Sequence, residues 1–344
     1  MSKTDSVVEN SPIFSKEVIN DRFNIYRFER ALAESSFAED VKTGLSAENK
    51  FLYPKYFYDV RGSEIFDRIT RIEDYYPTRT EESILIERSA DIIEFSKNKP
   101  VMVELGSGTS TKTRHILEAK HRTGLPLNYI PLDVSDILIP TSEQLLKDYS
   151  NLTINGIISE YITGYRIVKD IDPSPNLTIF LGSSIGNFRR EYIKEFLTKI
   201  ANEMHDDDAL LIGFDLIKDE EVLLRAYNDS EGLTAEFNLN ILRRINNELG
   251  GNFDLGKFKH ESIFNREKSR IEMHLISTVD QTVQIKDIDL TVNFKKGETI
   301  HTENSYKFND DLIMGFADAA GLEWITTWND ERKYFALTLF NKKS

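Results

Sequence analysis

Residues 101–112 carry the pattern with the clearest chemical meaning in this sequence. An apolar run ends at Glu104, turns through Gly106 and Gly108, and continues into a helix-like pattern that begins at Thr111. Glycines let a backbone approach a ligand closely, and the free amide N–H groups at a helix start point toward it. The pattern therefore predicts a strand, a ligand-binding turn and a helix, with a plain loop as the alternative.

A second acidic residue, Asp133, ends the next apolar run and suggests which ligand this turn binds. In α/β nucleotide sites, an acid at the tip of the second strand suits a ribose diol. The turn lacks the third glycine of a dinucleotide fingerprint, and Lys112 lacks the preceding glycine of a phosphate loop. Glu104 would repel a pyrophosphate but attract a cation. S-adenosylmethionine (SAM) carries a sulfonium and no phosphate, so these residues favour a SAM-dependent methyltransferase.

Two tyrosines between residues 53 and 79 are candidates for a ligand pocket. Tyr58 and Tyr75 carry hydroxyls just before expected turns, whereas Tyr56, Phe57 and Phe66 are expected to be packing residues. Packing is also the alternative for Tyr58 and Tyr75.

The segment 181–188 places small residues and one amide at the tip of an expected strand. The amide of Asn187 both donates and accepts hydrogen bonds, which suits an amino-acid head group. The alternative is that Asn187 caps the following helix.

Three residues later in the chain are weaker candidates. Tyr227 is a lone aromatic residue on an expected helix, where packing is the usual role. Glu303 and Ser305 share one face if their segment is extended, and such a pair could hold an imidazole. A solvated strand is the alternative for them.

The six histidines show no metal-binding spacing, and no metal is expected. His260, His274 and His301 are interpreted as structural residues. There is no Gly-x-Ser-x-Gly motif of a hydrolase either.

The composition describes an ordinary globular protein of 344 residues with a net charge of −14 and no cysteine. The charge argues against nucleic acid or an anionic membrane as a partner, and the lack of cysteine excludes disulfides and thiolate chemistry. With neither a signal peptide nor a membrane span in the pattern, we expect a cytoplasmic monomer that acts on a small molecule.

Strand and helix patterns alternate through the middle of the chain and predict an α/β fold with a parallel, Rossmann-like sheet. A helix over 310–320 and two further strands predict a C-terminal antiparallel hairpin. Strands are expected at 101–105, 128–133, 151–157, 177–182, 209–215, 322–328 and 334–340, and helices at 111–121, 136–149, 189–204 and 219–229.

Helical spacing over 22–44, and a capping box of Thr78 and Glu81 that opens a helix through Phe95, are expected before the sheet. A helix over 233–249 and strand-like runs at 269–278 and 283–294 follow it. We therefore predict two units. The first is a methyltransferase domain over 80–216 and 308–344. The second is an α+β substrate-binding lobe over 20–79 and 217–307, after a loosely ordered start at 1–19.

From about residue 53 to 340 the chain resembles the histidine-specific Nα-methyltransferases of ergothioneine biosynthesis. The segments that carry the resemblance are FYDVRGSEIFDRIT, YYPTRTE, VELGSGTSTKT, PLDVS, LGSSIGNF, AYND with GLTAEFNLN, and TENSYKF.

The resemblance implies roles at matching positions. It assigns SAM binding to Gly106, Lys112, Asp133, Glu160 and Tyr161. The family often has Asp-Phe where this chain has Glu160-Tyr161, which is a conservative departure. The positions that hold histidine are Tyr75, Asn187, Tyr227, Glu303 and Ser305, and Met273 matches a residue near the imidazole.

The chemistry then suggests how the reaction proceeds. Tyr58 and Asn187 are hypothesised to hold the α-nitrogen, and positioning is expected to matter more than a strong base. Three transfers would give trimethylhistidine (hercynine). The alternatives are a methyltransferase of the same build for another amino acid or an indole amine, or a non-catalytic binding homologue.

Overall fold

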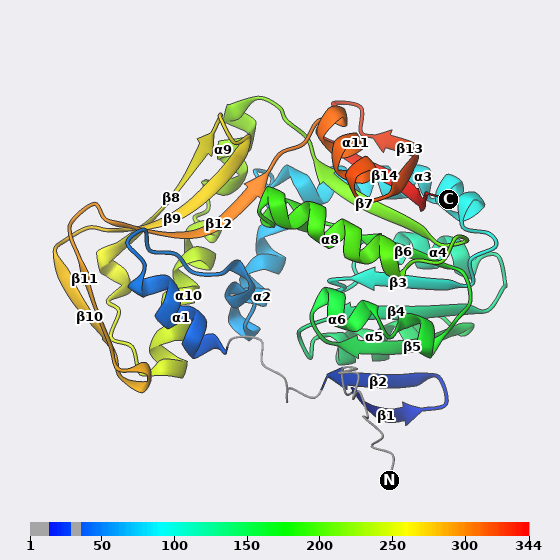
Figure 1. Cartoon of the computed structure of the whole chain (residues 1–344), viewed down its shortest axis with the longest axis horizontal. Helices are drawn as coiled ribbons and strands as arrows, with labels where there is room; N and C mark the ends of the chain where they lie inside the picture. The colour runs from blue at the N-terminus through cyan, green and yellow to red at the C-terminus, as the bar shows by residue number, and fades with distance from the viewer. Residues whose placement is uncertain (1–13, 29–35, 344) are drawn as a thin grey trace, which may run out of the picture.

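A nine-stranded sheet forms the centre of the molecule in the computed structural model, which describes residues 14–28 and 36–343. Its strand order is β1-β2-β5-β4-β3-β6-β7-β14-β13 (Figure 1). The five central strands run parallel, which confirms the expected α/β class. They are β3 (Val101–Leu105), β4 (Leu127–Asp133), β5 (Leu152–Ile158), β6 (Asn176–Phe180) and β7 (Ala209–Asp215).

Helices cover both faces of this sheet, so β3, β6 and β7 are buried along their whole length. Parallel strands covered in this way are expected to be continuously apolar. One apolar cluster joins the sheet to α3 (Tyr76–Phe95), α4 (Arg114–His121) and α5 (Leu138–Asp148). The cluster on the other face includes α6 (Tyr161–Tyr165), α7 (Val168–Ile171), α8 (Arg190–Glu203) and α11 (Asp310–Ala319).

An antiparallel hairpin extends each edge of the parallel strands. At one edge, β14 (Phe335–Lys342) pairs with β7 and with β13 (Leu322–Asn329), which confirms the expected C-terminal hairpin. At the other edge, β2 (Phe23–Phe28) runs parallel to β5 and antiparallel to β1 (Phe14–Asn20).

The hairpin of β1 and β2 corrects the prediction for the N-terminal segment. The single helix expected over 22–44 is wrong, since residues 23–28 form a strand and, among the described residues of this range, helix occurs only in α1 (Phe37–Ser46). Phe23 and Ile25, at alternate positions of β2, both point into the core. This spacing of two residues is typical of a strand, but in so short a segment it also fits the start of a helical pattern. Residues 14–19, expected to be loosely ordered, form most of β1 and pair with β2, whereas residues 1–13 lie outside the described part.

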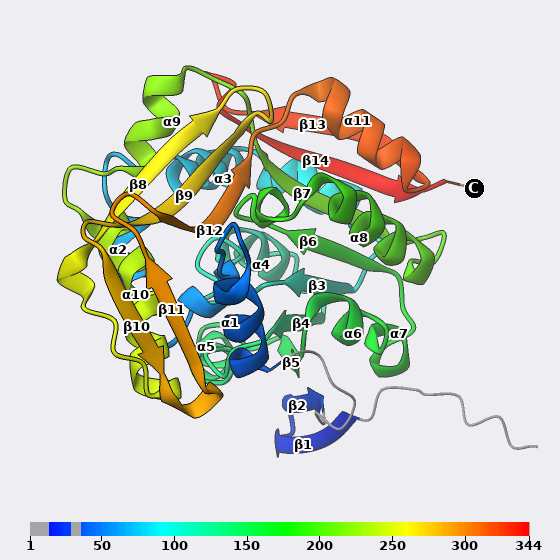
Figure 2. The same ribbon diagram turned by 60° about the vertical axis from the view of Figure 1, so that its left-hand side comes forward.

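A second lobe lies beside the carboxyl ends of the parallel strands (Figures 1 and 2). It contains a three-stranded sheet, a two-stranded hairpin and several helices around an apolar cluster of its own. Its helices are α1, α2 (Val60–Ile69), α9 (Glu220–Tyr227) and α10 (Leu233–Leu249), with short turns η1 (Pro54–Phe57), η3 (Leu255–Lys257) and η4 (Lys286–Ile288). Its strands are β8 (Phe258–Asn265), β9 (Arg270–Ser277), β10 (Gln281–Ile285), β11 (Leu290–Phe294) and β12 (Thr299–Tyr306).

The helix α3 begins at Tyr76 after Tyr75, and Thr78 makes no cap with Glu81, so the expected capping box is wrong.

Within residues 14–28 and 36–343, no helix combines the length and the apolar character needed to cross a membrane.

Candidate functional site

The glycine turn after β3 brings three predicted residues together at the carboxyl edge of the sheet. Gly106 has φ +71°, and a Cβ atom placed on it would lie 2.9 Å from the hydroxyl oxygen of Tyr161. The Asp133 carboxylate accepts a hydrogen bond of 2.8 Å from the backbone N–H of Gly108. A larger residue at position 106 would therefore need a strained backbone and a displaced tyrosine. The edge of the sheet holds Gly106, Asp133 and Tyr161 in one cradle.

Glu104 lies beneath this cradle. It is only 3% exposed, and its two carboxylate oxygens accept hydrogen bonds from Thr113 and Tyr129. Burial raises its pKa from 4.5 to about 7, despite these two hydrogen bonds. Both oxygens therefore have partners within the protein, and the charge of Glu104 lies buried next to the turn.

Lys112 forms an ion pair with Glu81, the residue predicted to complete a capping box. The Glu81 carboxylate is fully buried and also accepts the backbone N–H of Gly182, at 2.8 and 2.9 Å from its two oxygens. Glu81 thus connects the loop after β6 with the turn at Lys112 that precedes α4. A carboxylate inside an amphipathic helix gave no signal of this role.

Glu160 is exposed at the end of β5, and its carboxylate lies 3.9 Å from the ammonium group of Lys55 in the lobe. Next to it, the Tyr161 ring packs against Phe180 with a centroid distance of 5.3 Å. Glu160 therefore faces the junction of the two units.

A series of aromatic contacts in the lobe joins three of the four tyrosine candidates. Tyr58 packs edge-on against Phe66 at a centroid distance of 5.5 Å, and Phe66 packs against Tyr75 at 6.2 Å. Tyr75 in turn packs against Tyr227 at 6.3 Å. Phe66, expected to be a packing residue, is the contact that holds Tyr58 and Tyr75 near each other.

A β-bulge in β12 sets the direction of Glu303. His301 pairs with His274 of β9, but Glu303 pairs with Met273 and Ser305 with Ile271, because one extra residue intervenes. Paired residues share a face of a sheet, so the bulge turns Glu303 and Ser305 to the side of Met273 and away from His301. The predicted shared face is confirmed, and Met273 lies beside Glu303 on it.

Glu303 is a buried carboxylate, 9% exposed, and among the described residues its side chain has no hydrogen-bond or ion-pair partner. Burial raises its pKa to about 7, and the charge of Lys307 opposes this shift. A solvated strand residue would behave differently, so that alternative is wrong. Such a carboxylate is suited to accept an N–H group from a ligand.

The charge of Glu303 acts on all three lobe tyrosines. Desolvation comes first and Glu303 is a further cause in raising the pKa of Tyr58, Tyr75 and Tyr227 well above the usual value. Tyr58 is affected although 38% of its surface is exposed. The phenols therefore stay protonated at neutral pH and remain hydrogen-bond donors.

Lys307 connects Ser305 and Tyr227 with Asp215, and the sequence did not predict this role. Its ammonium group is fully buried and donates to Asp215 and Ser305 at 2.7 Å each and to the Tyr227 hydroxyl at 3.2 Å. Tyr227 also donates to Ser305 Oγ at 2.7 Å. The sequence offered one signal, that Lys307 follows Ser305 by two residues, just after the end of β12, so that both side chains lie on the same side of the extended chain.

Asn187 ends the 3-10 turn η2 (Ser184–Asn187) and is half buried. The helix α8 begins after Arg189 without a side-chain cap, so the alternative role for Asn187 as a helix cap is wrong. Gly186 beside it approaches the strand β12 so closely that a Cβ atom would lie 2.9 Å from the Tyr306 carbonyl oxygen. The Asn187 amide has no hydrogen-bond partner in the described part of the chain, which leaves it available to a ligand.

Comparison with known proteins agrees with this geometry. Residues 37–342 match the family described as histidine-specific methyltransferase, SAM-dependent. The chain is 41% identical over 304 residues to a histidine N-alpha-methyltransferase of Mycobacterium tuberculosis, a match that covers 88% of this chain and 94% of the relative. A protein of the same name from Mycolicibacterium smegmatis is 40% identical, over 90% of this chain and 97% of the relative.

A fungal relative is longer. The ergothioneine biosynthesis protein 1 of Neurospora crassa is 30% identical over 80% of this chain, which spans 32% of that protein.

Proposed function

The chain belongs to the family of histidine-specific, SAM-dependent methyltransferases, and we propose that it methylates the α-amine of L-histidine three times to give hercynine. The unpartnered carboxylate of Glu303 is the observation that carries this proposal for the substrate.

The residues at the strand ends fit SAM. The turn at Gly106 leaves open the space that a Cβ atom would fill beside Tyr161, and the Asp133 carboxylate beside it can accept a ribose hydroxyl. We propose that Gly106, Asp133 and Tyr161 hold the adenosine part, with Lys112 and Glu160 at its borders. When bound, SAM supplies a methyl group on a cationic sulfur, and the charge of Glu104 beneath the turn favours such a cation.

We assign the imidazole of histidine to Glu303 and Ser305. A neutral imidazole has one N–H group and one nitrogen lone pair, and this pair of side chains matches both. Glu303 can only accept when it is ionised. Ser305 Oγ already accepts from Tyr227 and Lys307, so its own hydrogen is left to be donated to the lone pair. Lys307 is thus a positioning residue that sets the polarity of Ser305.

Tyr58 and Asn187 are proposed to hold the amine. The nitrogen must be uncharged to attack a methyl group, and losing its proton to water costs about 1.36 kcal/mol per pKa unit, so no strong base is required. Asn187 can accept an amine hydrogen and donate to the substrate carboxylate, whereas the phenol oxygen of Tyr58 can accept another amine hydrogen, which leaves the nitrogen lone pair free to attack the methyl group. Orientation of the nitrogen then supplies most of the rate acceleration.

Growth of the product to a trimethylated cation suits an aromatic surrounding. The rings of Tyr58, Phe66 and Tyr75 form a continuous set of contacts beside Glu303. Contact of a quaternary ammonium with such rings contributes roughly 0.5–2 kcal/mol. The name of the fungal relative supports a place for this product in ergothioneine biosynthesis.

Mass spectrometry of histidine after incubation with the protein and SAM tests the proposal. We expect successive mass increases of one, two and three methyl groups on histidine, and none on tryptophan or the other amino acids offered in parallel. Methylation of tryptophan without methylation of histidine would refute the substrate, and a final product with one methyl group would refute trimethylation.

A further inference from the structure

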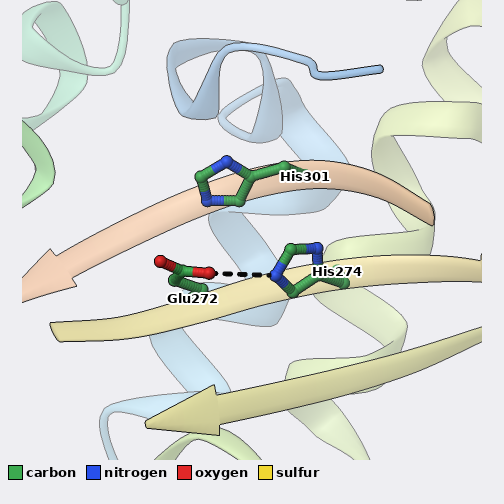
Figure 3. A group of neighbouring side chains, drawn as sticks. All are labelled: Glu272, His274 and His301. Carbon is green, nitrogen blue, oxygen red and sulfur yellow. Dashed lines mark ion pairs between the residues drawn. The ribbon is translucent and has the colours of Figure 1, made fainter. Parts of the chain in front are cut away.

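Three potential metal ligands gather on the face of the three-stranded sheet that points away from Glu303. Glu272 and His274 alternate on β9, and His301 of β12 pairs directly with His274 (Figure 3). The two imidazole rings are stacked with centroids 5.0 Å apart. One ligand atom from each of the three side chains lies within 4.8 Å of the other two.

The same face carries buried polar atoms without partners. His274 Nδ1 and Nε2 and Asn304 Oδ1 are three of the eight buried side-chain nitrogen and oxygen atoms that lack a hydrogen bond in the described residues. Asn304 pairs with Glu272, so it belongs to the same face. A buried polar group without a hydrogen bond costs about 1–3 kcal/mol, and His274 Nε2 has only a contact of 3.4 Å with Glu272, so this face would gain from a further bound group.

We propose that Glu272, His274 and His301 form a binding site for a divalent transition-metal ion of the Zn²⁺ type. Two imidazole nitrogens and one carboxylate oxygen form a ligand set that binds Zn²⁺ better than it binds Mg²⁺ or Ca²⁺. The amide oxygen of Asn304 or a water molecule would complete four ligands. Bonds of about 2.0–2.2 Å require the three side chains to close slightly around the ion.

The hydrogen bonds around the cluster leave suitable ligand atoms. His301 Nε2 lies 3.0 Å from the carbonyl oxygen of Glu303, which can only accept, so Nε2 carries the proton and Nδ1 keeps a lone pair. Arg270 holds one carboxylate oxygen of Glu272, and the other faces His274 Nε2 at 3.4 Å. The nearby positive charge of Arg270 will weaken the binding but leaves one carboxylate oxygen free.

The proposed metal site lies next to the bulge of β12 that directs the Glu303 side chain. His301 holds the Glu303 carbonyl within the bulge that turns the Glu303 side chain toward the substrate space. An ion on His301 Nδ1 would fix this ring and, through it, the bulge. Metal ligands oriented by a carbonyl in this way are common in zinc sites.

Titration of the untagged full-length protein with Zn²⁺ by calorimetry tests this inference. We expect one site per chain, with affinity lowered at least about tenfold in His274→Ala and in His301→Ala. His115→Ala, which removes a half-buried histidine next to Glu82 on the other unit, is the matched control and should bind as the wild type does. Absence of Zn²⁺ binding to the wild type, or equal binding by all four proteins, would overturn the proposal.

The wild-type protein loaded with Co²⁺ gives a second readout that needs no variant. Coordination by two imidazoles and a carboxylate in a four-ligand site should give strong visible absorption bands that Zn²⁺ abolishes on addition. A weak spectrum like that of the hydrated ion would contradict the site. Neither measurement depends on methyl transfer, so their outcome is separate from that of the proposed activity.

Discussion

The hydroxyl of Tyr227 donates a hydrogen bond of 2.7 Å to Ser305 Oγ, across a separation of 78 residues in the chain. With Lys307 as a second donor, Ser305 has both of its accepting positions filled. Its own hydrogen must then point to another group, and we propose that this group is the substrate imidazole. The relationship explains why a tyrosine on α9 matters for a site on β12.

Replacement of Tyr227 by phenylalanine should weaken the binding of histidine. The lost donor frees Ser305 to rotate, and one hydrogen bond of about 1–1.5 kcal/mol corresponds to a rise in KM of about tenfold. Steady-state kinetics with histidine as the varied substrate measures this. Tyr165→Phe is a matched control, because Tyr165 is also buried and also bonds a hydroxyl, that of Thr178, but it lies against the nine-stranded sheet and not in the lobe. Equal KM values for both variants would contradict the assigned role.

Replacement of Glu303 by glutamine should raise KM for histidine by about 10- to 100-fold. A hydrogen bond to a charged group contributes about 1.5–3 kcal/mol, and the amide keeps the shape but loses the charge. Glu298→Gln serves as the control, since Glu298 pairs with Lys50 near the start of the same strand without facing the site. Calorimetric SAM binding should be equal in both variants and the wild type. An unchanged KM in Glu303→Gln would remove the basis for histidine recognition.

The sequence predicted the parallel sheet and its glycine turn because both depend on local patterns. Asp133 and Gly106 could be assigned from strand ends alone, and the structure brings them together through Gly108. Lys307 and Glu81 could not be found in this way. Their roles depend on partners far away in the chain, Asp215 for Lys307 and Gly182 for Glu81, and a buried lysine or glutamate leaves no periodic signal.

The β-bulge at His301 shows the same limit on a smaller scale. Strict alternation would place His301, Glu303 and Ser305 on one face, and the prediction for Glu303 and Ser305 succeeded because both follow the extra residue. The residue types in this segment do not predict a bulge. The grouping of His301 with His274 and Glu272 was therefore invisible before the strand register was known.

Gly106→Ala should reduce both stability and SAM binding. An alanine must adopt φ +71° and must also displace the Tyr161 hydroxyl, 2.9 Å from the new methyl group. The positive φ alone costs about 1–2 kcal/mol. Gly124→Ala is the control for the cost of the positive φ, because Gly124 has φ +73° and open space around it. Chemical unfolding and SAM titration should show a larger loss for Gly106→Ala. Equal losses in both would mean that Tyr161 does not border the cradle closely.

Tyr58→Phe should slow methyl transfer by about 10- to 100-fold if its hydroxyl holds the amine nitrogen, which corresponds to the loss of one strong hydrogen bond of about 1.5–3 kcal/mol. Single-turnover rates with histidine and with dimethylhistidine measure the effect on the first and the last transfer. The ring contacts of Tyr58 with Phe66 and Phe237 remain in this variant, so the fold should be unaffected. Unchanged rates with both substrates would exclude a role for the hydroxyl.

SAM binding should tighten as the pH rises through 7, because of Glu104. Burial raises the pKa of this carboxyl to about 7, so its contribution to stability is greatest below about pH 4.5, the unfolded value, and declines as the pH rises through 7. Its negative charge grows over the same range, and with it the attraction for a cationic ligand. A charge interaction of about 1 kcal/mol would lower the dissociation constant about three- to fourfold between pH 6 and pH 8, because the carboxyl is only partly ionised at pH 6.

The variant Glu104→Gln separates this effect from the titration of SAM itself. Glutamine keeps an acceptor oxygen for Thr113 or Tyr129 but cannot ionise, and the ammonium group of SAM titrates equally in both experiments. Calorimetric titrations at about pH 6, 7 and 8 should therefore give dissociation constants for the wild type and the variant that diverge with pH. Parallel curves would mean that the charge of Glu104 does not reach the bound cation, and that this buried carboxyl serves the turn only through its hydrogen bonds.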